Sequence, residues 1–271
     1  MARVSVVPRE RVAVVPLPHR FSGDAETRAY LSGPKAPLHL FIHEFRSGTI
    51  LDIGPTESDC LAYVWTGEVE AEGERLYAGS SLVVEHGATL RLVGAGQGAQ
   101  VLTFTAAETH EPSRAGGRVH LLPRERVLRV PGMISGVNGG MHFDSDCPTC
   151  EIWLHENEFT PAFITPESVQ RSPHSHTEDE IIFVTAGQMR LGNRLYAAGT
   201  ALAVSANTMY SFNPGPEGIS FVNFRAAKPG DIIRADGQRN SETAGWQRHL
   251  GGNRPNYIEP DAPCRPASAD H

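Results

Sequence analysis

Short apolar runs, separated by glycine, proline and polar residues, recur along the chain and predict β-strands. Residues 61–67 and 181–187 each form an apolar run that ends at a glycine, and residues 81–84 and 201–204 form two shorter runs. Runs of this length are typical of strands buried between two sheets. The 27 glycines and 20 prolines favour turns over helices. The pattern therefore predicts an all-β protein.

The chain also repeats itself, which predicts two copies of one β-domain. Residues 8–16 return, nearly unchanged, as residues 123–131, which lie 115 positions later. Gly67 and Gly79 correspond to Gly187 and Gly199, which lie 120 positions later. Chance rarely gives several such matches in order at a nearly constant offset.

The repeat sets the expected domain organisation. We expect an N-terminal barrel over residues 1–115, a C-terminal barrel over residues 116–235 and a C-terminal tail over residues 236–271. The boundary is placed near the small residues of 114–117. The tail has no counterpart in the first copy, so we expect it to pack over a barrel or over a partner subunit.

Composition and charge limit where the protein can be located and what it can bind. The chain has no run of about 20 apolar residues, so no transmembrane helix is expected, and its N-terminus lacks the apolar core of a signal peptide. The net charge of −7 and the pI near 5.9 argue against a nucleic-acid partner. Four cysteines do not suggest a disulfide scaffold. We expect a cytoplasmic protein with a small-molecule substrate and neither a nucleic-acid nor a membrane partner.

His174, His176 and Glu180 form the clearest chemical motif in the chain. With Gly187 they give the spacing His-x-His-x3-Glu-x6-Gly. Alternate side chains of a strand share a face, so the two imidazoles can point the same way, and a bend can return the carboxylate to them. Two imidazoles and one carboxylate suit a non-haem Fe(II) or a related divalent metal. The alternative is a polar loop with solvated histidines.

This spacing resembles the first conserved motif of the cupins, which are small jelly-roll barrels. The glycine that usually opens the motif is replaced by Ser168. Moving the motif back by 120 residues reaches Gly54, Thr56 and Cys60, which are not a good joint ligand set for a divalent ion. The resemblance implies a bicupin with a degenerate N-terminal barrel and one divalent metal per chain. Fe(II) is favoured, and Mn, Ni or Zn are the alternatives.

Tyr210 stands where the second cupin motif usually supplies a third histidine ligand. It can be a phenolate ligand, which needs its pKa of about 10 to be lowered by the metal. It can instead be a phenol that donates a hydrogen bond or a proton to a bound substrate, or an aromatic core residue. Tyr210 is therefore the candidate catalytic residue beside the three metal ligands.

Cys147 and Cys150 form a lone Cys-x2-Cys pair, with His142 and His155 nearby in the sequence. A structural zinc site needs four such ligands. A zinc site, a disulfide and two ordinary thiols all remain open. For His155, a place in the pocket and a place in the core also remain open.

The expected pocket is mostly apolar, because Ile182 and Val184 share the face of Glu180, and Phe212 lies near Tyr210. Such a pocket fits a small organic substrate. The leading hypothesis is a non-haem Fe(II)-type dioxygenase that acts on a small aromatic or keto substrate. The alternatives are an oxygen-independent isomerase, lyase or aminohydrolase that uses Mn, Ni or Zn, and a non-catalytic binding protein. A homodimer is expected, because barrels of this kind have open sheet edges.

Overall fold

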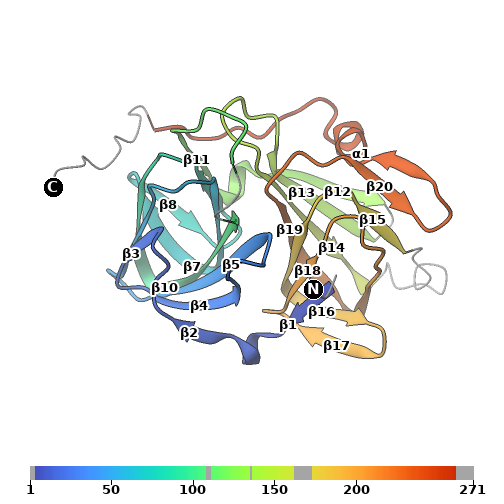
Figure 1. Ribbon diagram of the computed structural model, residues 1–271, viewed down its shortest axis with the longest axis horizontal. Coiled ribbons are helices and arrows are strands. Elements are labelled where there is room, and N and C mark those ends of the chain that lie inside the picture. Colours follow the sequence, from blue (N-terminus) through green and yellow to red (C-terminus); the bar gives the residue numbers. More distant parts are fainter. Residues whose placement is uncertain (1–3, 108–110, 135, 162–172, 261–271) are drawn as a thin grey trace. The chain divides into compact units, whose positions relative to one another are not determined.

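A computed structural model describes residues 4–107, 111–134, 136–161 and 173–260. It confirms the all-β prediction: the strands form three sheets, and the described residues hold a single α-helix, α1 (Glu242–Leu250). The chain divides into two compact units, each built on a jelly-roll barrel (Figure 1). No helix in the described part is long and apolar enough to cross a membrane.

The two units interleave along the chain, whereas the predicted division is sequential. The C-terminal barrel unit comprises Met1–Arg11, Leu128–Ser145 and Trp153–Pro255. The N-terminal barrel unit comprises Val12–Val127, Asp146–Ile152 and Asn256–His271. The chain therefore passes between the units at several points, and residues near 115 are not one of them.

The opening strand of each repeat explains this division. Strand β1 (Val4–Val7) pairs antiparallel with β18 (Ala201–Val204), and β11 (Val119–Leu122) pairs antiparallel with β9 (Ser81–Val84). Residues 4–7 shifted by the 115 positions of the first repeat give residues 119–122, so β1 and β11 are equivalent strands. Each copy of the repeat thus contributes its opening strand to the barrel of the other copy.

The N-terminal barrel unit contains one sheet with the strand order β11-β9-β7-β10-β5-β4-β2, to which β3, β6 and β8 are attached. Its remaining strands are β2 (Ala13–Val15), β3 (Phe21–Gly23), β4 (Glu26–Leu31), β5 (Leu38–Phe45), β6 (Ile50–Ile53), β7 (Cys60–Ala71), β8 (Glu74–Tyr77) and β10 (Leu90–Ala106). The short helix η2 (Arg124–Arg126) follows β11.

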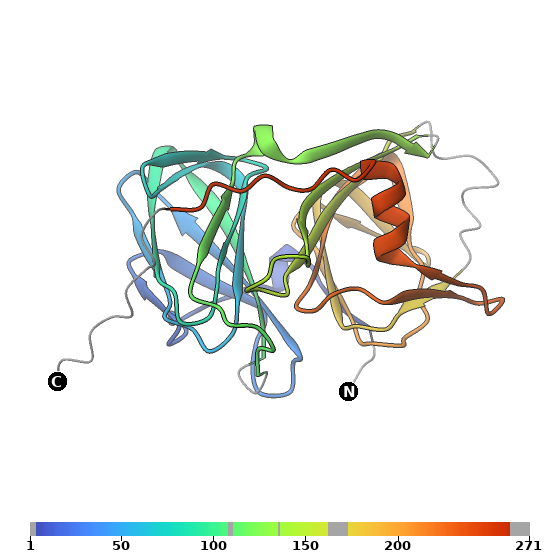
Figure 2. The same cartoon turned by 90° about the horizontal axis from the view of Figure 1, so that it is seen from above.

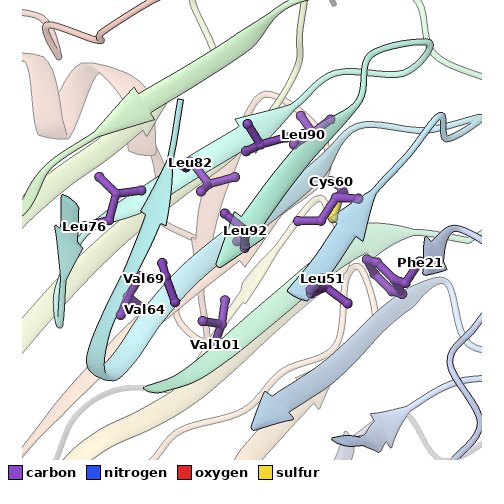
Figure 3. Close-up of a cluster of buried hydrophobic side chains, with 14 of the residues drawn as sticks. Phe21, Leu51, Cys60, Val64, Val69, Leu76, Leu82, Leu90, Leu92 and Val101 are labelled. Carbon is purple, nitrogen blue, oxygen red and sulfur yellow. The ribbon is translucent and has the colours of Figure 1, made fainter. Parts of the chain in front are cut away.

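Apolar side chains from most of these strands fill the N-terminal barrel. Leu51, Leu82 and Val101 belong to this core, and Figure 3 shows them between the strands with Phe21, Val69 and others. Cys60 and Leu90 lie in the same core. These are the positions that align with Glu180 and Tyr210, and in this barrel they serve packing. Burial also raises the pKa of the Cys60 thiol to about 12.

The C-terminal barrel unit has a sheet with the strand order β1-β18-β16-β19-β14-β13-β12, to which β17 is attached, and a second sheet with the order β15-β20-β21. Its remaining elements are η1 (Arg9–Arg11), β12 (Leu128–Ile134), β13 (Val137–Asp144), β14 (Trp153–Phe159), β15 (His174–His176), β16 (Glu180–Leu191), β17 (Arg194–Ala197), β19 (Asn213–Arg225), β20 (Asp231–Arg234) and β21 (Arg239–Ser241). Ser168 lies outside the described residues.

The tail predicted from residue 236 onward is divided between the two units. Helix α1 follows β21 (Figure 2), and its Trp246 and Leu250 pack in a cluster with Trp153. The side chain of Ser241 accepts a hydrogen bond from the backbone N–H of Ala244 and so caps the start of the helix. Further on, Ile258 forms a β-bridge with Leu121 of β11 in the N-terminal barrel unit. Residues 261–271 lie outside the described part.

Candidate functional site

A pocket of about 540 Å³ opens in the C-terminal barrel unit, and His174, His176 and Tyr210 line it. Its apolar walls include Ile182 and Phe212, as the strand pattern predicts. Exposed polar residues complete its lining, among them Arg234, Gln238, Arg248 and His249. Polar residues outnumber apolar ones in the lining, so the pocket is more polar than the sequence predicts. A concave site with an apolar wall and placed polar groups is the usual form of a small-molecule site.

Strand β15 places the two histidines of the motif beside Tyr210. The rings of His174 and His176 lie 5.1 Å apart between centroids, and the rings of His174 and Tyr210 lie 4.9 Å apart. Two backbone hydrogen bonds join the chain at these residues, from His174 N to Tyr210 O (3.0 Å) and from Tyr210 N to His174 O (2.9 Å). Tyr210 therefore forms an antiparallel β-bridge with His174 at the start of β15.

Glu180 begins strand β16 and is buried. Its Oε2 accepts hydrogen bonds from Asn223 Nδ2 (2.8 Å) and from Arg225 Nη2 (3.1 Å), while its Oε1 has no hydrogen-bond partner among the described residues. Burial alone would raise the pKa of Glu180, but the charge of Arg225 and then that of His176 lower it below the usual value. Glu180 is thus an ionised carboxylate with one buried oxygen available to a ligand.

Glu242 orients the imidazole of His176. Its Oε2 lies 3.0 Å from His176 Nδ1, whereas His176 Nε2 faces Glu180, with 3.9 Å between Nε2 and Oε2. A carboxylate only accepts hydrogen bonds, so Glu242 favours the tautomer with the proton on Nδ1 and a lone pair on Nε2. Arg225 Nη2 also lies 3.1 Å from Nδ1 and can only donate, so this second contact favours the opposite tautomer. Metal-binding histidines are commonly fixed by a carboxylate in this way.

Arg225 is a central residue of this site that the sequence analysis missed. It is fully buried, and its Nη1 donates to Glu242 Oε2 (2.6 Å) while its Nη2 donates to Glu180 Oε2 (3.1 Å). The two-residue period of β19 contained the signal, since Phe221 and Asn223 line the pocket and Arg225 continues the same face. Glu242 lay in the predicted tail and gave no comparable signal.

Tyr210 is almost fully buried and lies beside Phe212, with the two rings stacked and their centroids 6.4 Å apart. Burial raises the pKa of its phenol well above the usual value, and the negative charge of Glu180 raises it further. Tyr210 therefore remains a protonated phenol at neutral pH. The phenol is hydrogen-bonded to the carboxylate of Glu180, so it lies at the candidate metal site and can act there as a proton donor.

A second cluster of potential ligands lies in the N-terminal barrel unit. Of the His, Cys, Asp and Glu side chains that the structure describes, only Glu85, His120, Cys147 and Cys150 bring three or more ligand atoms within 4.8 Å of one another. The pocket is lined by His174 and His176 but not by Glu180. The ligand atoms of these three residues do not all lie within 4.8 Å of one another. The cluster contains neither His142 nor His155, the histidines considered from the sequence. His142 Nε2 lies 3.2 Å from Glu156 Oε2, and His155 Nδ1 accepts from Trp153 Nε1 (2.8 Å).

Electrostatics in this second cluster favour an ionised thiol. Hydrogen bonds from Cys150 and from His120 lower the pKa of Cys147 to about 2, although burial opposes the shift. Burial also opposes ionisation of His120, but hydrogen bonds to Cys147 and Glu85 raise its pKa to about 9. The hydrogen bond with Cys147, and then burial, raise the pKa of Cys150 well above the usual value. Without a metal, the cluster thus combines a Cys147 thiolate, a protonated His120 and a Cys150 thiol in a buried place.

No family model matches the sequence, and no curated protein matches it either. Solved structures do match the fold. Protein Ylba from E. coli, described with the family model DUF861, superimposes with a TM-score of 0.64 at 13% identity, over 83% of this chain and 91% of that chain. A putative glyoxylate-induced protein from Pseudomonas aeruginosa gives a TM-score of 0.61 at 12% identity, over 84% and 89% of the two chains.

Oxalate decarboxylases are also among the similar structures. The Lactobacillus farciminis enzyme, solved as a formate complex, gives a TM-score of 0.64 at 11% identity, over 85% of this chain and 88% of that chain. The Bacillus subtilis enzyme, described with Mn(II) centres, gives 0.60 at 12% identity, over 85% and 79%. These proteins have the cupin fold, so the two barrels of this chain are of the cupin kind. At such identities the likeness shows the fold alone.

Proposed function

We propose that this protein is a metal-dependent enzyme that acts on a small organic acid in the pocket of the C-terminal barrel. One observation carries the proposal. Glu242 holds the Nδ1 side of His176, with 3.0 Å between the two atoms, while Nε2 faces Glu180, whose Oε1 lacks a hydrogen-bond partner among the described residues. An oriented imidazole and an uncompensated carboxylate oxygen are what a divalent cation requires.

The donor types suit a divalent ion of the iron and manganese kind, and binding would draw the three side chains closer together than they lie here. His174, His176 and Glu180 would hold it, and the remaining coordination positions would be left to substrate and water. Such an ion, when bound, acts as a Lewis acid that polarises a carbonyl or carboxylate oxygen. The motif favours Fe(II), and the similar Bacillus subtilis enzyme is described with Mn(II).

Charge in the pocket supports an anionic substrate. Glu180 and Glu242 carry two negative charges against the single positive charge of Arg225, which leaves a net charge of −1 from these three residues. A divalent ion would change this to +1, and the exposed Arg234 and Arg248 add positive charge to the lining. A substrate with a carboxylate group, on a small aromatic or keto acid, matches this charge and the size of the pocket. Glyoxylate and oxalate appear in the descriptions of two similar proteins.

The test begins with the metal. His176→Ala should remove most of the iron or manganese that copurifies with the protein, whereas His249→Ala, at an exposed position of the pocket, should retain it. Elemental analysis of both variants beside the wild type measures this. Unchanged iron and manganese in His176→Ala would show that the motif does not bind the metal.

A panel of small aromatic and keto acids, followed with an oxygen electrode, then separates the reaction classes. Turnover with oxygen uptake supports the dioxygenase. Turnover without it supports an isomerase, lyase or aminohydrolase. Tight binding of a panel member without any turnover would contradict an enzyme and leave a binding protein.

Tyr210→Phe should lower turnover by about 10²-fold while iron or manganese content stays near that of the wild type. The substitution keeps the ring that packs beside Phe212 and removes only the hydroxyl, which is a protonated donor in this environment. Metal analysis and steady-state rates on the same preparation measure the two effects. Loss of the metal would instead make Tyr210 a ligand, and unchanged turnover would make it an aromatic core residue.

A further inference from the structure

We propose that the N-terminal barrel unit binds a structural zinc ion through Glu85, His120, Cys147 and Cys150. Their four ligand atoms lie within 4.8 Å of one another, and all four side chains are buried. This site is separate from the pocket residues and does not depend on the function proposed for them. It also adds a metal to the single ion per chain that the sequence predicts.

Three segments that are distant in the sequence supply the ligands. Glu85 directly follows β9, and His120 lies on β11, the strand that pairs with β9. Cys147 and Cys150 lie between β13 and β14, in the segment Asp146–Ile152 that belongs to the N-terminal barrel unit. An ion here would tie this segment and the exchanged strand β11 to the barrel.

The distances between ligand atoms match a tetrahedral zinc ion. Cys147 Sγ lies 3.6 Å from His120 Nε2 and 3.5 Å from Glu85 Oε1. Zn–S bonds of about 2.3 Å and Zn–N or Zn–O bonds of about 2.1 Å give tetrahedral edges of about 3.6 Å. His120 Nε2 and Glu85 Oε1 lie 2.7 Å apart, so their hydrogen bond would open by about 0.7 Å to admit the ion.

Neighbouring groups already orient the proposed ligands. His120 Nε2 is directed at Glu85 Oε1 of the cluster, and its Nδ1 lies 3.0 Å from Glu259 Oε1 without hydrogen-bond geometry. The backbone N–H of Arg118 donates to Glu85 Oε2 (2.9 Å), and Thr149 Oγ1 donates to Glu85 Oε1 (2.6 Å). Carboxylates on histidine ligands and hydrogen bonds on carboxylate ligands are the usual outer contacts of zinc sites.

Arg114 holds the cysteine turn itself. Its Nη1 donates to the carbonyl oxygens of both Cys147 and Cys150, at 2.6 Å for Cys150. Its guanidinium also offsets part of the negative charge that two thiolates and one carboxylate bring to a zinc ion. One side chain therefore holds the turn at both of its cysteines.

A closed set of four buried ligands distinguishes this site from a catalytic or redox one. Catalytic zinc keeps a coordination position for water, which three protein ligands would leave and four do not. A redox dithiol needs only its two sulfur atoms, and Cys147 and Cys150 are both free thiols. Glu85 and His120 would supply the other two corners of a tetrahedral site. A zinc ion therefore explains why all four side chains meet, whereas a redox pair explains only the two cysteines.

The decisive experiment uses Co2+ as a spectroscopic substitute for Zn2+ in the full-length protein. The protein is reduced, stripped with a chelator and titrated with Co2+. We expect thiolate-to-cobalt charge-transfer absorption and the intense visible bands of a tetrahedral ion, saturating at one ion per chain, and Zn2+ should abolish both. The pocket motif contains no thiolate, so His176→Ala should leave the charge-transfer band unchanged, and the result is independent of the proposed function.

Matched variants assign the ligands. Cys150→Ser should lose the charge-transfer band, whereas Cys60→Ser, which alters another buried cysteine of the same barrel outside the cluster, should keep it. Where Cys150→Ser does not fold, the wild-type titration decides alone, and Glu85→Gln, which keeps both thiols, should weaken Co2+ binding. The proposal is overturned if reduced wild-type protein shows no charge-transfer band, if Cys147 and Cys150 form a disulfide in place of binding the ion, or if the band survives at full intensity in Cys150→Ser.

Discussion

Replacing Arg225 with methionine is expected to destabilise the C-terminal barrel by about 3–5 kcal/mol. Arg225 is fully buried and bridges two carboxylates, with 2.6 Å from Nη1 to Glu242 Oε2 and 3.1 Å from Nη2 to Glu180 Oε2. The substitution leaves both carboxylates in the interior, with His176 as the remaining group that can neutralise them. An unpaired buried charge is among the most destabilising changes a protein interior can undergo.

Urea unfolding of metal-free protein measures this effect, because a bound cation would replace part of the lost charge. Arg234→Met, which removes an exposed arginine of the same pocket, should change the free energy of unfolding by less than about 0.5 kcal/mol. The double variant Arg225→Met/Glu242→Gln should recover part of the loss, since one of the stranded charges is then gone. A single Arg225→Met variant within about 1 kcal/mol of the wild type would show that the ion pairs contribute no net stability.

The sequence predicts the barrels well because their signals are local and periodic. The runs at 181–187 and 201–204 fall within β16 and β18, and the pocket contains His174, His176 and Tyr210 as the motif predicts. The repeat gave the number of barrels. The strand exchange could not be derived in this way, because the apolar segments at 4–7 and 119–122 suit either barrel. The barrel that each segment joins is set by long-range pairing, of β1 with β18 and of β11 with β9.

The charged groups were missed for a different reason. Arg225 and Glu242 are 17 residues apart, and Arg225 and Glu180 are 45 residues apart. Their meeting depends on the register of β19 against β16, in which Ile181 faces Phe224. In the same way, Glu85 and His120 meet through the pairing of β9 with β11, and Cys147 reaches them from the segment between β13 and β14. Apart from the strand parity that places Arg225 on the pocket face, such contacts carry no local signature. Spacing motifs therefore find the histidines and miss the residues that hold them.

Buried His43 is expected to make the N-terminal barrel less stable as the pH falls below about 6.5. Its ring nitrogens lie 2.8 Å from Thr27 Oγ1 and 2.9 Å from Thr103 Oγ1, and its side chain has no exposed surface. Burial lowers the pKa of His43 from 6.5 to about 3. Between these values the unfolded chain binds a proton that the folded protein excludes. The contribution of His43 is therefore complete above about pH 6.5 and is lost as the pH falls towards about 3.

The His43→Gln variant isolates this effect, because an amide can still bond to both threonines but does not titrate. From pH 7 to pH 4.5 the wild type should lose about 3 kcal/mol more than the variant, since each pH unit below the unfolded pKa costs about 1.4 kcal/mol. Urea unfolding at the two pH values gives the comparison. His19→Gln, at an exposed position of the same barrel, should follow the wild type. Equal losses of unfolding free energy in the wild type and His43→Gln would contradict the prediction. They would mean that the pKa of His43 is the same in the folded and the unfolded protein, so that His43 accepts its proton inside the folded barrel.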